Sequence, residues 1–395
     1  MKPPSFTLTA GPGLMSDRVR GALAAQTVAH TDPFFHERFV NLERKLAHLL
    51  GTDHDVVLMQ AEAIVGLEAG ARGLTAPGTK WLNLVSGPYG AWFADWLHAC
   101  GAEVVTHRVP YDESIDPADV ERILDEHGDI ECVAVVHCET PSGMQNPLEE
   151  ISRAAHARGA LTMSDSVAAF ASAPLRVDDW HVDLCVVAGH KCLGATAGMS
   201  IVSVSPAAWE KMAANPNAPR GSFLSLLDWK ERWIDAGRTS FLHDPSVAEV
   251  NAIDAAVDEL IELGLETSIA RHVRAAEATR AGVRAMGLTP WAREDRFAAN
   301  CTTSVRCPEG VTPAQVVEHV RRRHGVMLST GAGELAERLI CLGHLGIAAG
   351  SLYPEVAVGA LGRGLVELGV DVDLGAGVAA VAERMAEPVP TAPGG

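Results

Sequence analysis

The sequence contains no run of about 18 uncharged apolar residues, which is the length that a membrane-spanning helix needs. Its first residues, MKPPSFTLT, also lack the continuous apolar stretch of a signal peptide. Positive charge is scarce too: 32 lysines and arginines stand against 50 aspartates and glutamates, so the net charge is −18. A field of this sign repels phosphate backbones and anionic lipids. We therefore expect no nucleic-acid partner and no membrane partner.

Disulfide-forming patterns are missing as well. The eight cysteines are scattered from Cys100 to Cys341, and no two of them form a CxxC pair. They lack the density that small disulfide-bonded secreted proteins show. We expect reduced thiols and a cytoplasmic location. The 395 residues, 47% of them hydrophobic, exceed the usual size of one domain, so we expect two.

Short apolar segments alternate with segments of helical periodicity along the first half of the chain. A helix is predicted at 34–50, ending at Gly51, a common residue after the last helical turn. The pattern predicts strands at 56–59, 81–85, 103–106, 132–136, 161–164, 184–187 and 200–204, most of them separated by helices at 61–73, 89–100, 117–125 and 148–158. Such alternation predicts an α/β fold with a seven-stranded, mainly parallel sheet covered on both faces. Ligands of these folds bind beyond the carboxyl ends of the strands.

The second half of the chain predicts a smaller α/β unit. A helical stretch at 246–285, broken near Gly264, leads into it, and strands at 302–305 and 325–328 and helices at 312–323 and 355–368 form it. We predict an N-terminal arm at 1–16, a large domain at 17–263, a small C-terminal domain at 264–386 and a tail at 387–395. The tail consists mainly of Pro, Ala, Thr and Gly, a composition typical of disorder.

Two chemically distinctive side chains follow neighbouring predicted strands. Asp165 follows the segment 161–164, and Lys191 follows 184–190. Enzymes that use pyridoxal 5′-phosphate (PLP) need a lysine to hold the cofactor aldehyde as a Schiff base, and a carboxylate at the pyridine nitrogen. Gly189 and Gly194 flank the lysine and leave backbone room for a bulky cofactor. A lysine after a strand is otherwise unremarkable, so the surrounding motifs have to decide.

Six segments, taken in order, resemble the class V aminotransferases, a group of fold-type-I PLP enzymes. They are LTAGP at 8–12, NLVSGPYG at 83–90, ETPSG at 139–143, SDSV at 164–167, GHKCLG at 189–194 and GHLG at 343–346. Within the family, the chain resembles the pyridoxamine–pyruvate, alanine–glyoxylate and serine–pyruvate branches most. The resemblance implies PLP as cofactor, a reaction at Cα of a small amino-acid substrate through an external aldimine, and a homodimer whose subunits share their active sites.

The resemblance also assigns roles to residues. Lys191 takes the catalytic role, Asp165 lies at the pyridine nitrogen, and Tyr89 covers the ring, with an ordinary core tyrosine as the alternative. Glu62 lies in the family's phosphate-binding loop, where it faces the substrate or simply begins a helix. His190 is either a phosphate donor or a buried histidine. The cofactor-binding set implied in this way is Asp165, Tyr89, Ala61, Glu62, Ala63, Thr140, Ser142, Val167, His190 and His243. No metal site is expected.

The family's substrate-binding arginines are absent. Cys341 stands where one arginine holds the substrate carboxylate with its planar fork, and Ala332 stands where a second occurs. Arg338 lies nearby but is expected to be solvated. Asp244 replaces a threonine that reaches the neighbouring subunit's phosphate, so either His243 takes over or the loop is rearranged. Glu62, Ala332 and Cys341 are therefore the predicted substrate residues.

Three functions remain open from the sequence. The first is transamination, with Lys191 moving a proton between Cα and the cofactor. The second, suggested by the missing arginines, is β-elimination (a C–S lyase), or decarboxylation with oxidative deamination, of a cysteine S-conjugate in secondary metabolism. The PLP enzymes of lincosamide-antibiotic biosynthesis are the precedent for it. The third is a non-enzymatic PLP-fold protein, which the presence of Lys191, Asp165 and Tyr89 together disfavours.

Overall fold

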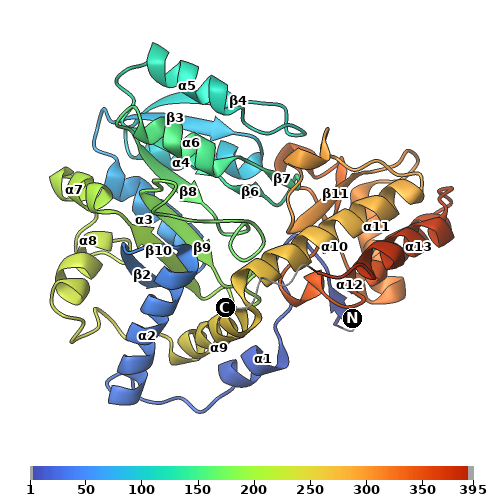
Figure 1. Ribbon diagram of the computed structural model, residues 1–395, viewed down its shortest axis with the longest axis horizontal. Helices are drawn as coiled ribbons and strands as arrows, with labels where there is room; N and C mark the ends of the chain where they lie inside the picture. Colours follow the sequence, from blue (N-terminus) through green and yellow to red (C-terminus); the bar gives the residue numbers. More distant parts are fainter. Residues whose placement is uncertain (1–2, 390–395) are drawn as a thin grey trace.

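A computed structural model describes residues 3–389. Figure 1 shows two bodies side by side: a larger one built from the blue to yellow part of the chain, and a smaller one built mainly from the orange and red part. The boundaries that we propose between them, and the arm at 1–16, stay predictions. Residues 1–2 of the arm and 390–395 of the proposed tail lie outside the described residues.

A seven-stranded sheet lies at the centre of the larger body. The strand order is β2-β10-β9-β8-β5-β3-β4. Neighbours pair in parallel except at β10, which is antiparallel to both β2 and β9. The mainly parallel seven-stranded sheet is therefore confirmed. The strands are β2 (Asp55–Gln60), β3 (Lys80–Val85), β4 (Glu103–Arg108), β5 (Cys132–Val136), β8 (Leu161–Asp165), β9 (Leu184–Ala188) and β10 (Met199–Val204).

Helices cover this sheet. They are α1 (Asp17–Leu23), α2 (Pro33–Leu50), α3 (Ile64–Leu74), α4 (Pro88–Ala99), α5 (Pro117–Glu126), α6 (Leu148–His156), α7 (Pro206–Ala214), α8 (Leu226–Trp229) with a π-helical turn at Lys230–Ile234, and α9 (Val247–Leu263). Helix α2 begins where the Asp32 carboxylate caps the amide of Phe34, and it ends at Gly51, whose φ of +62° only glycine adopts freely. A small hairpin, β6 (Cys138–Glu139) and β7 (Met144–Gln145), follows β5.

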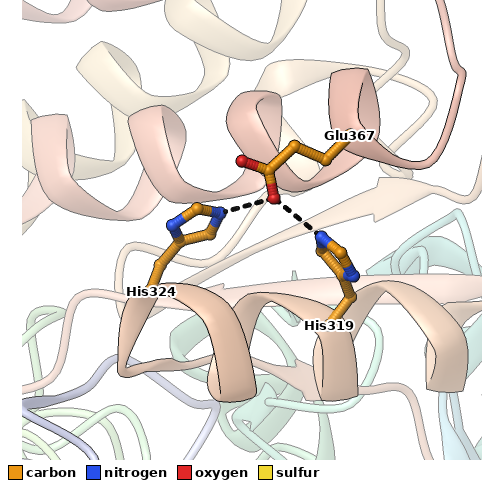
Figure 2. Close-up of side chains that lie close together, drawn as sticks. All are labelled: His319, His324 and Glu367. Carbon is orange, nitrogen blue, oxygen red and sulfur yellow. Dashed lines mark hydrogen bonds and ion pairs between the residues drawn. The ribbon is translucent and has the colours of Figure 1, made fainter.

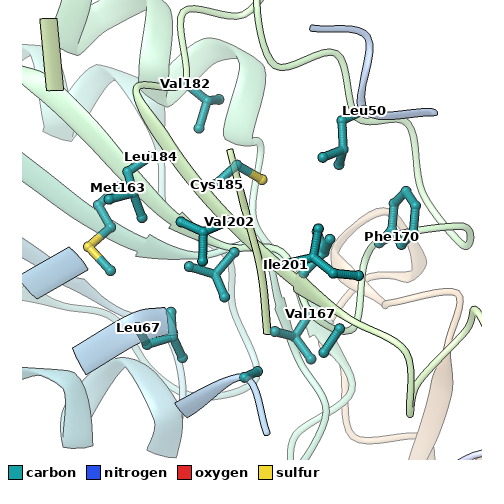
Figure 3. Packing of buried hydrophobic residues seen from close by; sticks show 14 of the residues in the cluster. Leu50, Leu67, Met163, Val167, Phe170, Val182, Leu184, Cys185, Ile201 and Val202 are labelled. Carbon is teal, nitrogen blue, oxygen red and sulfur yellow. The ribbon is translucent and has the colours of Figure 1, made fainter. Parts of the chain in front are cut away.

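The central strands, such as β5 and β9, are apolar because both of their faces are buried, whereas the edge strand β4 reads EVVTHR and is partly exposed. Figure 3 shows Val202 pointing toward Leu67 of α3, while its neighbour Ile201 points toward Phe170 on the opposite face. All of these side chains are at most 8% exposed. Each such side chain contributes roughly 1.5–3 kcal/mol when it leaves water, so the core holds the strand ends in fixed positions.

The smaller body follows the break at Gly264, after which α10 (Leu265–Ala285) crosses from one body to the other (Figure 1). Its sheet has the order β11-β14-β13, and a second core cluster that includes Val305, Val320 and Leu361 packs against it. Strand β1 (Phe6–Thr7) pairs in parallel with β12, which ties the N-terminal segment to this body. The elements are β11 (Thr302–Arg306), α11 (Pro313–His324), β12 (Val326–Met327), β13 (Ser329–Thr330), β14 (Leu339–Gly343), α12 (Tyr353–Glu367) and α13 (Leu374–Met385), with 3₁₀ turns at Asp295–Phe297, Gly333–Leu335 and Ile347–Ala349.

Length and hydropathy of the helices bear on membrane insertion. Across residues 3–389, none of them combines the length and the apolar character that crossing a bilayer requires. The cytoplasmic location stays a prediction.

Candidate active site

Lys191 and Asp165 meet at one edge of the large sheet. Asp165 is the last residue of β8, and Lys191 follows β9 after the short segment 189–190. Because β8 and β9 are adjacent and parallel, their carboxyl ends lie side by side. Both side chains line a pocket of about 260 Å³, together with Glu62, Ala63, Ile64, Leu67, Tyr89, Trp92, Phe93, Trp96, Val136, Cys138, Thr140, Val167, Ala168 and His190.

The Lys191 amine is buried against the N-terminal segment. Its Nζ donates a hydrogen bond to the carbonyl oxygen of Ala10 at 2.9 Å, and the residue is 8% exposed. Burial lowers the pKa of the amine, which favours its neutral, nucleophilic form. Gly11 passes so close that a Cβ there would lie 2.2 Å from Nζ. The LTAGP segment therefore forms one wall around the lysine, a contact that the sequence did not predict.

The Asp165 carboxylate lines the same pocket. Its Oδ1 accepts a hydrogen bond from the amide of Val167 at 3.1 Å, which fixes its orientation. Burial raises the pKa of Asp165 to about 6. The carboxylate is therefore ionised at pH 7 but binds a proton more readily than an exposed aspartate, so it suits a cationic ring nitrogen.

Tyr89 is held in the pocket by the start of α4. The Glu139 carboxylate accepts hydrogen bonds from the amides of Tyr89, at 3.1 Å, and Gly90, at 2.7 Å. It caps the helix from within the core, and burial raises the pKa of Glu139 to about 8. The role of Glu139 was not predicted from the sequence. Its position, three residues after the fully apolar strand β5, could have indicated it.

Glu62 and His190 form a second polar pair in the pocket. Oε2 of Glu62 accepts from the amide of Ile64 at 2.9 Å, at the start of α3, and Oε1 lies 3.2 Å from His190 Nε2. Burial lowers the pKa of His190 to about 4, so the ring is neutral at pH 7. Among the lining residues, all of which belong to the described chain, Lys191 is the one lysine and arginine is absent.

Two buried polar atoms of the lining residues lack a hydrogen-bond partner within residues 3–389. They are Thr140 Oγ1 and His190 Nδ1. Leaving such an atom unpaired costs about 1–3 kcal/mol, so both are suited to a ligand. An amine, a carboxylate, an aromatic ring and an unpaired hydroxyl around one cavity match the aldehyde, ring nitrogen, ring face and 3′-oxygen of a pyridoxal compound. The residues present therefore fit its ring.

Five of the predicted site residues do not line this pocket: Ala61, Ser142, His243, Ala332 and Cys341. Ser142 donates to the carbonyl of Glu139 at 3.3 Å, inside the turn. The Ala61 carbonyl accepts from Ser200 Oγ at 3.4 Å, and the His243 ring packs 5.6 Å from Trp229. The cofactor and substrate contacts suggested for these residues stay predictions.

The positions of the missing arginines lie in the smaller body. Cys341 is buried in β14, where its Sγ lies 3.2 Å from Ser304 Oγ. Ala332 is half-buried before the Gly333–Leu335 turn. Arg338 is exposed and stacks over the Trp291 ring at 4.7 Å, and it is not among the residues that line the pocket.

Comparisons with known proteins extend over nearly the whole chain. Residues 24–339 match the family model described as aminotransferase class-V. A pyridoxamine–pyruvate transaminase of Mesorhizobium japonicum is 38% identical over 377 residues, which is 95% of each chain. An uncharacterised aminotransferase of Methanocaldococcus jannaschii is 31% identical over 368 residues, 92% of this chain and 94% of the relative. The crystal structure of pyridoxamine–pyruvate aminotransferase from Mesorhizobium loti superposes with a TM-score of 0.94 at 37% identity, covering 97% of both chains.

Proposed function

The chain belongs to the class V aminotransferase family of PLP-dependent enzymes, and we propose on that premise that it transfers an amino group from a small amine to a 2-oxo acid at Lys191. The observation that carries the proposal is the meeting of Lys191 and Asp165 in one pocket, at the adjoining ends of β8 and β9. When bound, the pyridoxal ring serves as an electron sink for the carbon that loses or gains a proton.

The side chains of the pocket have different roles in this reaction. Burial lowers the pKa of the Lys191 amine, so this amine would hold the cofactor aldehyde and would serve to take up and return the substrate proton. The Asp165 carboxylate would pair with the ring nitrogen and favour its protonated form. Tyr89 would pack on the ring face, and the apolar wall that includes Trp92 and Phe93 would shield the reacting atoms from water.

We infer that the substrate is not held by the arginine pair of ordinary family members. Cys341 Sγ is engaged with Ser304, and Ala332 offers no charge. The second function that the sequence leaves open, β-elimination or decarboxylation of a cysteine S-conjugate, is not favoured, since the two relatives described above are named as a transaminase and an aminotransferase.

Glu62 favours a more specific function. A phosphate dianion beside this carboxylate would be repelled, whereas pyridoxamine carries an uncharged hydroxymethyl group at that end, which can donate to it. The name of the Mesorhizobium japonicum relative states that it acts on pyridoxamine and pyruvate. We propose that pyridoxamine is an amino donor of this chain as well and that its ring occupies the ring site.

A donor and acceptor screen tests both levels of the proposal. The purified protein is incubated with pyruvate and, in separate arms, with pyridoxamine or with amino acids plus PLP, and the alanine or oxo acid formed is measured. Amino-group transfer that disappears in the Lys191→Ala variant supports transamination. No transfer in any arm refutes it.

The Glu62→Gln variant tests the proposal that pyridoxamine is a donor. It should lower the preference of the enzyme for pyridoxal over PLP at least about tenfold. The control variant is Glu68→Gln. Glu68 lies on α3, which begins two residues after Glu62; it pairs with Arg72 and does not line the pocket, so the preference of this variant should not change.

We also propose that the protein is a homodimer with shared active sites. Ile64 and Trp92 line the pocket yet are 51% and 49% exposed, which suits contact with a second subunit. Light scattering of the purified protein should give twice the chain mass. A monomer with full transaminase activity would contradict the shared site.

A further inference from the structure

Two histidines and a glutamate meet in the smaller body, apart from the pocket of Lys191. Figure 2 shows His319 and His324 reaching from α11 toward Glu367 on α12. Their Nε2 atoms lie 2.8 Å and 3.1 Å from the same carboxylate oxygen, Oε2. The three candidate ligand atoms all lie within 4.8 Å of one another. Nothing in the transaminase reaction uses this cluster.

Helix packing builds the cluster. Gly364 lets α12 approach α11 so closely that a Cβ there would lie 2.4 Å from Val320 and 3.9 Å from the His319 ring. Glu367, the last residue of α12, therefore lies across the final turn of α11, which His324 ends. Arg363, one turn before Glu367, donates to the other carboxylate oxygen, Oε1, at 3.1 Å. This bond orients the carboxylate and leaves Oε2 directed at the imidazoles.

We propose that His319, His324 and Glu367 bind a divalent transition metal of the zinc type, with water completing the coordination. Zinc bonds of roughly 2.0–2.2 Å to nitrogen and oxygen place neighbouring ligand atoms roughly 3.4 Å apart in a tetrahedral site. The two contacts to Oε2 are shorter by a few tenths of an ångström, so small side-chain rotations make room for the ion. Two imidazoles and one carboxylate select zinc, copper or nickel over magnesium or calcium, which prefer oxygen ligands.

Burial and charge agree with this assignment. The side chains of His319, His324 and Glu367 are 24%, 23% and 25% exposed, so the ligands are held by packing while water still reaches them. Arg363 supports the ligand from behind, as the outer partners of metal ligands do. The metal would tie the ends of α11 and α12 together without touching the catalytic pocket.

Zinc titration of the full-length protein tests the proposal. After chelator treatment and dialysis, the protein competes with a zinc-binding dye, and its melting temperature is measured with and without Zn²⁺. We expect one tight equivalent, a zinc-dependent rise in melting temperature, no such rise with Mg²⁺, and unchanged transaminase activity. The double variant His319→Ala/His324→Ala should bind zinc at least about 100-fold more weakly.

Two further variants keep the outcome decisive. Glu367→Gln retains the size of the side chain but removes the charge, and it should also weaken zinc binding. His98→Ala removes an exposed histidine of α4 outside the cluster and should bind like the wild type. If the wild type binds no more zinc than the double variant, or if His98→Ala loses as much as the double variant, the assigned site is wrong.

Discussion

Replacing Asp165 by Asn should stabilise the cofactor-free protein at neutral pH while it weakens the binding of the ring. In the folded chain, the pKa of Asp165 is raised to about 6 from an ordinary value of 3.8. Because this pKa is higher in the folded chain than in the unfolded chain, the protonated Asp165 side chain stabilises the fold. This contribution to the free energy of unfolding is complete below about pH 4 and is lost as the pH rises through about 6. The wild type therefore keeps a half-buried carboxylate charged at pH 7.5, which lowers its free energy of unfolding.

The size of that cost follows from the pKa and the surroundings. The difference between the folded and ordinary values corresponds to about 3 kcal/mol at most. Because the side chain is half-buried and faces the pocket, water screens it, and we expect roughly 1–2 kcal/mol. An unfolding entropy typical of this chain length converts this to a rise in melting temperature of about 1–3 °C. Asparagine still accepts from the amide of Val167, so the backbone need not move.

Melting curves of the cofactor-free protein at pH 4.5 and pH 7.5 measure the effect. Asp165→Asn should melt above the wild type at pH 7.5 and by a smaller margin at pH 4.5, while Asp95→Asn, on the exposed face of α4, should match the wild type at both. With pyridoxal bound, the sign reverses: the lost charge pair should weaken binding at least about 30-fold. A variant that melts below the wild type at pH 7.5, or that binds the ring equally well, would refute the reasoning.

Three further changes probe the same site. Lys191→Ala should lose borohydride-stable labelling by pyridoxal, measured by peptide mass spectrometry, and at least about 100-fold in turnover, without a fall in melting temperature. Gly11→Ala places a methyl group 2.2 Å from the Lys191 amine at a φ of +141°, so turnover should fall at least about tenfold, while Gly21→Ala, with open space around it, should keep full turnover. Glu139→Gln leaves one of the amides of Tyr89 and Gly90 without its acceptor, which should cost about 1–3 kcal/mol in urea unfolding and raise KM for the amino donor.

Local pattern was enough to predict the large sheet. Strand β5 reads CVAVV and is buried along its whole length, and helix α2 carries its own cap at Asp32 and stop at Gly51. In each case a short stretch of sequence contains the physical cause. The antiparallel direction of β10 was not predicted, because a buried apolar strand shows the same pattern in either direction. Helix α13 was also missed, since the glycines of its first turn, Gly375 and Gly377, lower its helix propensity.

The candidate site divides in the same way. Lys191 and Asp165 could be found from the sequence because the motifs GHKCLG and SDSV resemble those of the family, and their position after predicted parallel strands agreed with a shared site. The hydrogen bonds of Glu139 to α4 could not be predicted from the sequence, because packing brings together residues that are 49 and 50 positions apart in the chain.

The sequence by itself determined the fold class, because strand periodicity is a local property, and it marked the lysine and the aspartate, because the short motifs that resemble the family contain them. Tertiary structure alone decided which side chains share the pocket, that Cys341 lies outside it, and that Glu367 meets His319 and His324 across two helices. These contacts depend on how closely elements distant in the chain pack, as at Gly364, and no stretch of sequence contains that distance.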